Sequence, residues 1–423
     1  MRRFYTLMWY LALPLVLARL WWRGRKEPGY RGHWGERLGF YGAHAGAMPT
    51  IWLHAVSVGE TRAAEPLVDA LMAAYPGSRI LLTHMTPTGR ATGQQLFAQH
   101  GARFMQSYLP YDTVFMARRF LRHFAPQVCI LMETEVWPNL VAACRTEDVP
   151  VALVNARLSA RSLRRGQKFG RLTTDAARAL TLVAAQTPAD AQRIASLGAP
   201  RVEVTGSIKF DVVPPPAALA LGAWLRARFG TRPVLLCAST RDGEEALILD
   251  AWRPQDKALL VLVPRHPQRF DDVAALVAAR GLSVARRSQL AQDGEVTADV
   301  LVGDSMGEMF AYYAACDCAY IGGSLLPLGG QNLIEACAVG KPVLVGPHTF
   351  NFALATEQAV EAGAALRCLD APAMVAAATG LLQDGIARAR MGAQALDFAT
   401  QHRGATARTV ELLRQLISQD LLP

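Results

Sequence analysis

The chain has 423 residues, of which 51% are hydrophobic and 19% are charged, so intrinsic disorder is excluded and a sizeable core is expected. Its seven cysteines are scattered and form no C-x-x-C pair, which excludes a zinc ribbon, a c-type haem attachment site and a secreted disulfide scaffold. Residues 1–213 carry 26 Lys and Arg against 14 Asp and Glu, whereas residues 214–423 carry 18 against 21. An anionic partner is therefore expected for the first half: nucleic acid, lipid headgroups or a phosphorylated substrate.

An apolar segment opens the chain. Residues 4–18 read FYTLMWYLALPLVLA, and the stretch from Phe4 to Trp22 is just long enough to cross a bilayer. No small-residue cleavage site follows it, and more Lys and Arg follow the segment than precede it. Residues 1–26 are therefore interpreted as a membrane anchor with a basic flank, and the bulk of the chain as cytoplasmic. Pro14 and Arg19 leave open whether the segment spans the membrane or lies in one leaflet, and a buried core helix is the alternative.

Short apolar runs alternate with helical periodicity from residue 51 onward. The runs predict strands at 51–55, 79–84, 128–132, 151–154 and 181–185, and then at 233–238, 258–263, 299–302, 317–321 and 342–346. Such alternation is typical of parallel sheets covered by helices on both faces. The Pro-rich stretch 212–216 separates the two series. We therefore expect a first α/β domain at 27–213, a linker at 214–216, and a second α/β domain with closing helices at 217–423, with a cleft between the domains.

Three loops of the first domain carry candidate catalytic side chains. In HAVSVGE, residues 54–60, Glu60 opens a helix, where it is either a general base or simply an acidic residue that stabilises the helix dipole. In ETEVWPN, residues 133–139, Glu133 and Glu135 follow a predicted strand, but two carboxylates are too few for a metal site. No D-x-D motif occurs in the chain, so no essential metal is expected. In GSIKFD, residues 206–211, Lys209 is either a surface cation or the partner of a phosphate or carboxylate.

The loops of the second domain suit a ligand that carries a negatively charged group and a ring with hydroxyl groups. Arg265 and His266 lie where a strand gives way to a helix, and arginine suits bidentate contact with phosphate. The segment GDSMGEM, residues 303–309, and the Gly-rich run GGSLLPLGGQNLIEAC, residues 322–337, each lead into a helix. The run fits neither the dinucleotide fingerprint nor a P-loop.

The order of these motifs is more specific than any one of them. HAVSVGE, TPTGR (86–90), YLPYD (108–112), ETEVWPN, NARLSARS (155–162), GSIKFD, ASTRDGEE (238–245), VPRHPQRF (263–270), GDSMGE and VGPHTFNF (345–352) occur in series. In this respect the chain resembles the Kdo transferases of Gram-negative bacteria, the 3-deoxy-D-manno-octulosonic acid transferases of lipopolysaccharide synthesis. The resemblance extends from the N-terminal segment to about residue 352.

The resemblance implies an α/β GT-B fold, with two Rossmann-like domains facing a cleft, and an enzyme of the inner membrane. It makes residues 27–213 the acceptor domain and residues 217–423 the nucleotide-sugar domain. Its donor would be CMP-Kdo and its acceptor a lipid A precursor, lipid IVA, with inversion at the sugar, release of CMP and no cofactor. It places the catalytic base at Glu60 and groups that stabilise the transition state at Glu133 and Lys209. The residues expected to contact CMP are Arg265, His266, Met306, Gly307, Glu308, Asn332, Leu333, Ile334 and Glu335. Gln331 departs from the pattern, because many relatives have His there, and Gln does not titrate near neutral pH.

Two other functions compete with this interpretation. One is a membrane-associated GT-B enzyme that uses a different nucleotide sugar, and the other is a catalytically inactive binding protein with the same fold. Joint retention of Glu60, Glu133 and Lys209 argues against the inactive protein. A nucleic-acid partner is not expected, because the basic residues are not interleaved with aromatics in any recognisable binding motif.

Overall fold

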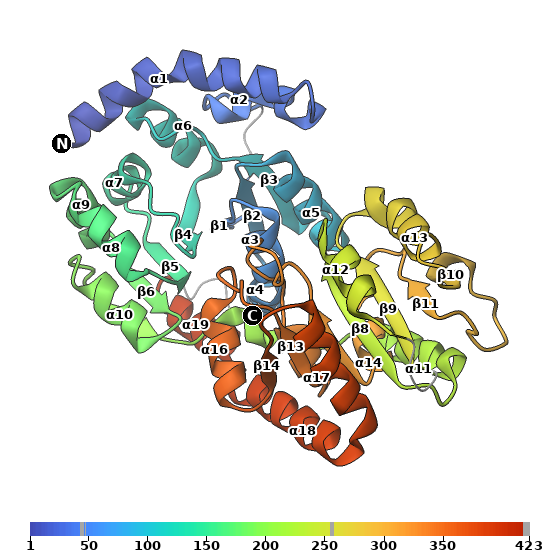
Figure 1. The fold of residues 1–423 in the computed structure, drawn as a ribbon. Helices are drawn as coiled ribbons and strands as arrows, with labels where there is room; N and C mark the ends of the chain where they lie inside the picture. Colours follow the sequence, from blue (N-terminus) through green and yellow to red (C-terminus); the bar gives the residue numbers. More distant parts are fainter. Residues whose placement is uncertain (43–45, 47, 254–257, 418–423) are drawn as a thin grey trace. The chain divides into compact units, whose positions relative to one another are not determined.

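The chain folds into two compact α/β units (Figure 1). The computed structural model describes residues 1–42, 46, 48–253 and 258–417. Unit 1 comprises residues 1–211 together with residues from 403 onward, and unit 2 comprises residues 212–402. Residues 254–257 and 418–423, which the sequence assigned to the second domain, lie outside the described residues.

Unit 1 is built on a parallel sheet of seven strands within its described residues, in the order β3-β2-β1-β4-β5-β6-β7. The strands are β1 (Thr50–His54), β2 (Arg79–His84), β3 (Phe104–Tyr108), β4 (Pro126–Met132), β5 (Val151–Ala156), β6 (Leu182–Ala185) and β7 (Val202–Val204). The helices are α1 (Arg2–Arg23), α2 (Trp34–Arg37), α3 (Val58–Ala63), α4 (Glu65–Ala74), α5 (Pro87–Phe97), α6 (Val114–Phe124), α7 (Pro138–Thr146), α8 (Ala160–Gln167), α9 (Arg171–Arg178), α10 (Pro188–Ala195) and α19 (Ala405–Arg414). The described residues of the unit also form the 3-10 turns η1 (Pro28–Arg31), η2 (Ala98–Arg103) and η3 (Ile208–Asp211).

Unit 2 repeats this architecture. Its described strands form a seven-stranded parallel sheet in the order β10-β11-β9-β8-β12-β13-β14. They are β8 (Val234–Thr240), β9 (Leu259–Pro264), β10 (Val284–Arg286), β11 (Val300–Val302), β12 (Cys318–Ile321), β13 (Val343–Val345) and β14 (Ala365–Arg367). The helices are α11 (Pro216–Phe229), α12 (Glu244–Ala251), α13 (Phe270–Ala278), α14 (Met309–Ala315), α15 (Ile334–Ala338), α16 (Ala353–Glu361), α17 (Ala371–Gln383) and α18 (Gly385–Gln401), with 3-10 turns η4 (Pro267–Arg269) and η5 (Arg287–Gln289).

The central strands bury both faces, which is why they read as continuous apolar runs. In β1, Ile51 and Leu53 point into one core cluster and Trp52 into another on the opposite face of the sheet. All ten predicted strands are present. The four that were missed, β3, β7, β10 and β14, lie at the sheet edges and are shorter or more exposed, so they carry no comparable apolar signal.

The C-terminal helix departs from the predicted division of the chain. The sequence placed the closing helices with residues 217–423, but α19 belongs to unit 1. Its residues Ala405, Val410 and Leu413 pack in the same core cluster as Leu67 of α4. The physical reason is the apolar face of α19, which is buried on the helix layer of the first sheet. The predicted linker, residues 214–216, also extends one residue too far, because Pro216 is already the first residue of α11.

Helix α1 lies along unit 1 beside α2 and α6 (Figure 1). It is long and apolar enough to cross a membrane, by length and composition. One side, which includes Trp9, Leu13 and Leu17, packs against a small cluster that contains Tyr30 and Tyr111. On the other side, several large apolar side chains are exposed, namely Phe4, Leu7, Leu11, Leu15 and Trp22. The structure thus places α1 on unit 1, whereas the sequence set residues 1–26 apart from that domain.

Candidate active site

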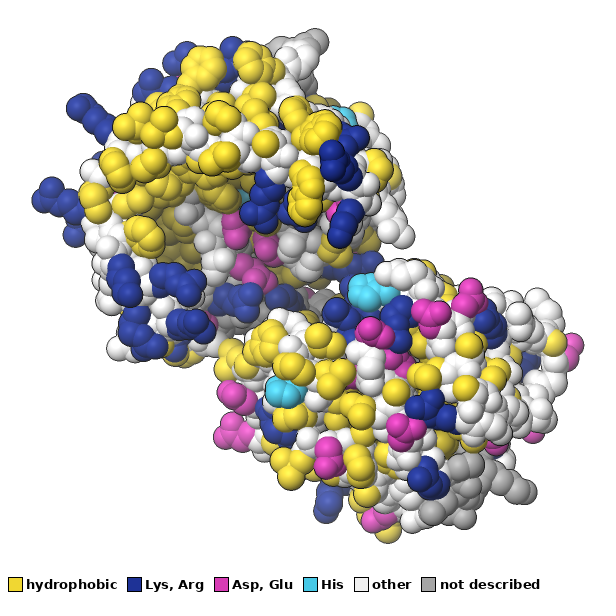
Figure 2. Space-filling model, turned by 45° about the horizontal axis from the view of Figure 1, so that its top comes forward, with side chains coloured by type: hydrophobic (Ala, Val, Ile, Leu, Met, Phe, Trp, Pro, Cys, Tyr) yellow, Lys and Arg dark blue, Asp and Glu magenta, His cyan; other side chains and the backbone are white. Residues whose placement is uncertain are grey.

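Two candidate catalytic residues of unit 1, Glu60 and Glu133, and a third side chain, Arg157, follow three adjacent strands, β1, β4 and β5. Glu60 is in the first turn of α3, the helix after β1, while Glu133 and Arg157 directly follow β4 and β5. Parallel strands end at a common edge of the sheet, so the topology gathers these side chains there. Figure 2 shows a hollowed face of unit 1 in which Asp and Glu side chains lie beside Lys and Arg.

Glu60 takes part in a helix cap. Ser57 is the N-cap residue of α3, and its hydroxyl accepts a hydrogen bond from the backbone N–H of Glu60 at 3.4 Å. The Glu60 carboxylate in turn accepts from the backbone N–H of Val56 at 2.8 Å and from the Ser57 hydroxyl at 3.3 Å. This reciprocal arrangement resembles a capping box, except that the carboxylate reaches one residue further back. The structural role considered from sequence is therefore real, and it also orients the carboxylate.

The surroundings of Glu60 suit a general base near neutral pH. Burial raises the pKa of its carboxyl group to about 7, against the lowering effect of the Val56 and Ser57 hydrogen bonds. The negative charges of Glu135 and Glu133 raise the pKa further. A carboxylate with a pKa near the working pH can accept a proton and is still ionised in a large fraction of molecules.

Glu133 is buried between two cations. Only 5% of the residue is exposed, and its two carboxylate oxygens pair separately: Oε1 lies 2.8 Å from Nζ of Lys209, and Oε2 lies 3.0 Å from Nε of Arg157. A buried carboxylate is costly unless it is paired in this way. Glu133 also has a φ of +56°, a left-handed conformation that is unusual for a residue with a Cβ. Such strain is of order 1–3 kcal/mol and concentrates at functional sites.

Lys209 is held in place by contacts distant in sequence. It belongs to η3, where the neighbouring Ile208 and Phe210 are buried. The backbone N–H of Ile208 donates to Oδ1 of Asn155, at the end of β5. Asp211 accepts hydrogen bonds from backbone N–H groups at the start of α19, those of Gly404 and Thr406. The C-terminal helix therefore anchors the segment that presents Lys209 to Glu133.

Two members of this cluster were not assigned a role from the sequence. Arg157 was visible only as part of the motif NARLSARS, because an arginine after a strand has no distinctive local signal. Glu135 was considered only as half of a metal-binding pair. It is half-buried, and burial followed by the charge of Glu133 raises the pKa of its carboxyl group. Arg157 joins the cluster through the pairing of β5 with β4, and Glu135 comes near Glu60 through the pairing of β4 with β1. No local pattern encodes either pairing.

In unit 2, the residues predicted to contact the nucleotide also gather at one edge of the sheet. They follow β11, β9 and β12, and in the sheet order only β8 separates β9 from β12. Arg265 and His266 come directly after β9. Burial lowers the pKa of the His266 imidazole, and the positive charges of Arg241, Arg265 and Arg269 lower it further. A concentration of positive charge like this one suits a phosphate.

Two buried glutamates shape this edge. The Glu244 carboxylate accepts hydrogen bonds from the Tyr320 hydroxyl at 2.6 Å, from the backbone N–H of Gly323 at 2.6 Å and from that of Leu325 at 3.0 Å. It thereby holds the start of the Gly-rich run. Glu245 accepts two hydrogen bonds from the Arg269 guanidinium, at 2.8 and 2.9 Å. These two acids of the ASTRDGEE motif are buried, and they hold the neighbouring loops by hydrogen bonds. The sequence did not predict this role.

The remaining predicted contacts differ in what they can present to a ligand. Asn332 donates to Oε1 of Glu335 at 3.1 Å, so these two polar side chains are mutually oriented. Leu333 and Ile334 are each 1% exposed, so their side chains serve the core and only their backbone remains for a ligand. In the segment 303–309, Met306 is exposed, Gly307 has a φ of +81°, and Glu308 pairs with Arg287 at 3.1 Å.

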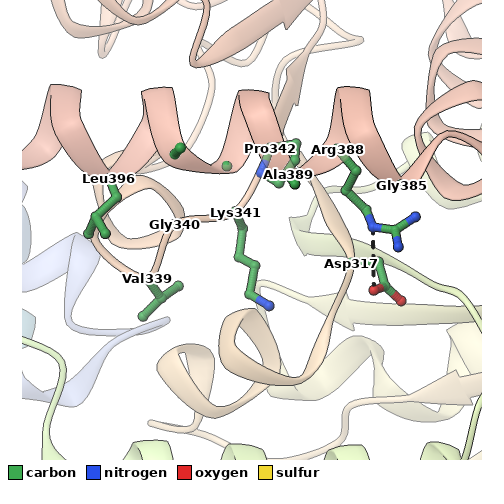
Figure 3. A pocket seen from close by; sticks show the side chains of 11 residues that line it. Asp317, Val339, Gly340, Lys341, Pro342, Gly385, Arg388, Ala389 and Leu396 are labelled. Atoms are coloured by element: carbon green, nitrogen blue, oxygen red, sulfur yellow. Dashed lines mark ion pairs between the residues drawn. The ribbon is translucent and has the colours of Figure 1, made fainter.

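A cavity of about 410 Å³ lies at the other end of the unit 2 strands (Figure 3). Asp317 and Pro342, which line it, immediately precede β12 and β13. Its Lys341 donates to the backbone carbonyl of Cys316, and its Arg388 pairs with Asp317 at 3.8 Å. None of the predicted nucleotide contacts lines this cavity. Within the described residues, no group of three or more His, Cys, Asp or Glu side chains is placed to hold a metal ion.

Comparison with known proteins identifies the family. The family described as 3-deoxy-D-manno-octulosonic-acid transferase (kdotransferase) matches residues 32–212. A 3-deoxy-D-manno-octulosonic acid transferase of Bordetella pertussis is 47% identical over 97% of this chain and 98% of its own. The chain belongs to the 3-deoxy-D-manno-octulosonic acid transferase family. A second member, from Haemophilus influenzae, is 37% identical over 99% of this chain and 100% of its own.

Membership makes this chain a Kdo transferase and therefore a glycosyltransferase. A glycosyltransferase structure from Rickettsia africae covers 88% of this chain and 100% of its own, with a TM-score of 0.59 and 11% identity. That likeness concerns the fold alone, and the GT-B architecture expected from the sequence is confirmed. The individual roles of Glu60, Glu133, Lys209 and the nucleotide contacts stay predictions.

Proposed function

We propose that this Kdo transferase moves Kdo from CMP-Kdo to a lipid A precursor, lipid IVA, with inversion at the sugar and release of CMP. The observation that carries the proposal is the cluster at the edge of the unit 1 sheet, where half-buried Glu60 lies near the paired Glu133 and Lys209. In a Kdo transferase, this arrangement provides a base and a fixed cation close together.

The reaction forms one bond and breaks another. The acceptor hydroxyl oxygen attacks the anomeric carbon of Kdo while Glu60 takes the hydroxyl proton. The bond between that carbon and the CMP phosphate oxygen breaks, and its electron pair leaves with CMP. Glu60 is ready for this step because burial has brought the pKa of its carboxyl group to about 7. Lys209, oriented by Glu133, offsets the negative charge that develops, and a well-placed donor of this kind is worth roughly 3–4 kcal/mol.

Unit 2 binds the donor in this proposal. Arg265 and His266, with Arg241 close enough to lower the pKa of the imidazole, attract the CMP phosphate. Asn332 and Glu335 are already oriented toward each other and present polar atoms for the ribose. A bound phosphate would also favour the protonated imidazole of His266, because its charge opposes that of the surrounding arginines.

Unit 1 meets the membrane and the acceptor. Exposed apolar residues on α1, such as Leu7, Leu11 and Leu15, suit the acyl layer of the inner membrane, and the basic residues after the helix suit its cytoplasmic headgroups. Because the opposite side of α1 packs on unit 1, we propose that the helix lies in one leaflet. The basic helix α8 begins three residues after Arg157, and it supplies cations for the acceptor's phosphate groups.

The test is mass spectrometry of the lipid products formed by the purified full chain. Preformed CMP-Kdo and tetraacylated lipid A precursor should give a product heavier by Kdo, together with CMP. UDP-sugars in place of CMP-Kdo test for a different donor and should give no product. Glu60→Gln is the control for an enzymatic product. A wild-type chain that binds CMP but forms no glycolipid would contradict the proposal and favour an inactive binding protein.

A further inference from the structure

The inner side of α1 touches the loop that carries the acidic residues of the active site. The hydroxyl of Thr6 lies 3.1 Å from Oδ1 of Asn139. The ring of Trp9 stacks on Tyr111 at 5.7 Å between centroids and contacts the tilted ring of Trp137 at 6.4 Å. Trp137 and Asn139 end the segment 133–139, which begins with Glu133.

This segment, the 133–139 loop, is fixed at both ends. At its start, Glu133 is paired with Lys209 and Arg157. At its end, the buried carboxylate of Asp112 accepts hydrogen bonds from the backbone N–H groups of Asn139, at 3.1 Å, and Leu140, at 2.8 Å. The side chain of Asn139 also donates to the carbonyl of Asp112 at 2.7 Å.

Helix α1 covers the second of these two attachments. Tyr111 and Asp112 belong to the segment after β3, and Trp9 packs on Tyr111 while Thr6 reaches Asn139. Without α1, the rings of Tyr111 and Trp137 and the Asp112–Asn139 hydrogen bonds would lose this cover. An amphipathic helix that served only as a tether would not need polar contact with a particular loop residue.

We infer that α1 is a positioning element of the active site: through Thr6 and Trp9 it holds the 133–139 loop so that Glu133 and Glu135 keep their places beside Glu60. The two sides of the helix then divide the work. Leu7, Leu11 and Leu15 face outward, toward lipid, and Thr6 and Trp9 face the loop. The inference rests on the proposed function, because it gives Glu60 and Glu133 their chemical roles.

The test compares the two sides of one helix in the full-length enzyme, purified in detergent micelles. Trp9→Ala removes the inner ring, Trp9→Phe retains an aromatic ring, and Thr6→Val removes only the hydroxyl. The matched control, Leu7→Ala/Leu11→Ala/Leu15→Ala, changes the outer side. Each variant is measured for kcat, for KM toward CMP-Kdo, for thermal midpoint and for sedimentation with phosphatidylglycerol-containing vesicles.

The two sides should give opposite patterns. Trp9→Ala should lower kcat by about 10- to 100-fold, the scale of a small misplacement of catalytic groups, with KM for CMP-Kdo unchanged. Trp9→Phe should recover most of kcat, and Thr6→Val should lower it with the same unchanged KM. The outer-side variant should keep its kcat in micelles and lose binding to vesicles.

Three results would overturn the inference. The first is a kcat within twofold of wild type in both Trp9→Ala and Thr6→Val. The second is a lower thermal midpoint in these variants with kcat per folded molecule unchanged, which would make the contact merely structural. The third is an equal loss of kcat in the outer-side variant. A wild-type enzyme that fails to transfer Kdo would instead contradict the proposed function, so the two failures are distinguishable.

Discussion

The ammonium group of Lys209 lies 2.8 Å from Oε1 of Glu133, although 76 positions separate the two residues in the chain. Their meeting requires the β4–β5 pairing, which sets Glu133 beside Arg157, and the anchoring of η3 by α19. A charged pair in which one partner is 24% exposed and the other is almost fully buried is oriented by its surroundings and still open to a ligand.

The Lys209–Glu133 pair predicts that removal of the Lys209 ammonium group lowers kcat. Lys209→Met should lower kcat by about 10²–10³, because an oriented donor to developing charge is lost, while binding of CMP is little changed. Single-turnover kinetics with preformed donor measure this step. In the matched control, Arg201→Met, a half-buried arginine of the same unit that pairs with Glu203 is removed, and kcat should be unchanged. Equal kcat in Lys209→Met and wild type would remove Lys209 from the mechanism.

The role of Glu60 as a general base predicts the turnover of the Glu60→Gln variant and the dependence of the wild-type kcat on pH. Glu60→Gln keeps its shape but does not accept a proton, so turnover should fall by about 10²–10⁴ with CMP affinity little changed. In the wild type, kcat should rise with pH through about 7, as the carboxyl group loses its proton. A variant that retained more than about a tenth of wild-type turnover would exclude Glu60 as the base.

The same pKa predicts how stability depends on pH. The folded-state pKa of Glu60 is raised from 4.5 to about 7, so between these values the folded chain binds more protons than the unfolded chain. Its contribution to the free energy of unfolding therefore falls as pH rises through this window. The thermal midpoint of Glu60→Gln relative to wild type should accordingly improve from pH 5 to pH 8. A difference that is constant with pH would show that the pKa is not raised.

The basic helix α8 predicts a change in acceptor recognition. Residues 157–171 carry six Lys and Arg and no acid, and α8 buries none of its residues. The triple variant Arg161→Gln/Arg164→Gln/Arg165→Gln should raise KM for the phosphorylated acceptor severalfold and weaken its dependence on salt. The control, Arg118→Gln/Arg122→Gln/Arg145→Gln, removes equal charge from α6 and α7 and should leave KM unchanged. The same effect in both variants would indicate net charge rather than α8.

The buried position of Glu244 predicts that the CMP-Kdo site depends on a residue that does not touch CMP-Kdo. Glu244→Gln replaces a carboxylate, which only accepts hydrogen bonds, by an amide. At least one of the Tyr320 hydroxyl and the backbone N–H groups of Gly323 and Leu325 then loses its hydrogen-bond acceptor. An unsatisfied buried donor costs about 1–3 kcal/mol, and the Gly-rich run should loosen. Calorimetry should show a lower thermal midpoint and weaker CMP binding. Unchanged CMP affinity in a destabilised variant would show that the run does not contribute to the donor site.

Local pattern sufficed for much of the architecture. Each of the ten strands predicted from apolar runs is present, because a strand buried on both faces must be apolar throughout. The same reasoning failed for the edge strands β3, β7, β10 and β14, since an edge position does not require a continuous apolar run. The motifs in series also sufficed for the family, and Glu60, Glu133 and Lys209 could be singled out one by one.

Tertiary structure alone decided how these residues are combined. The order of the strands and the packing of helices distant in sequence produce three contacts. Arg157 pairs with Glu133, Asp211 accepts hydrogen bonds from the start of α19, and Thr6 of α1 reaches Asn139. Burial likewise brings the pKa of Glu60 to about 7, whereas its place at a helix start indicates only a favourable charge–dipole contact. Hydrophobic periodicity is a property of neighbouring residues, but desolvation and charge pairing depend on every segment that packs around a side chain.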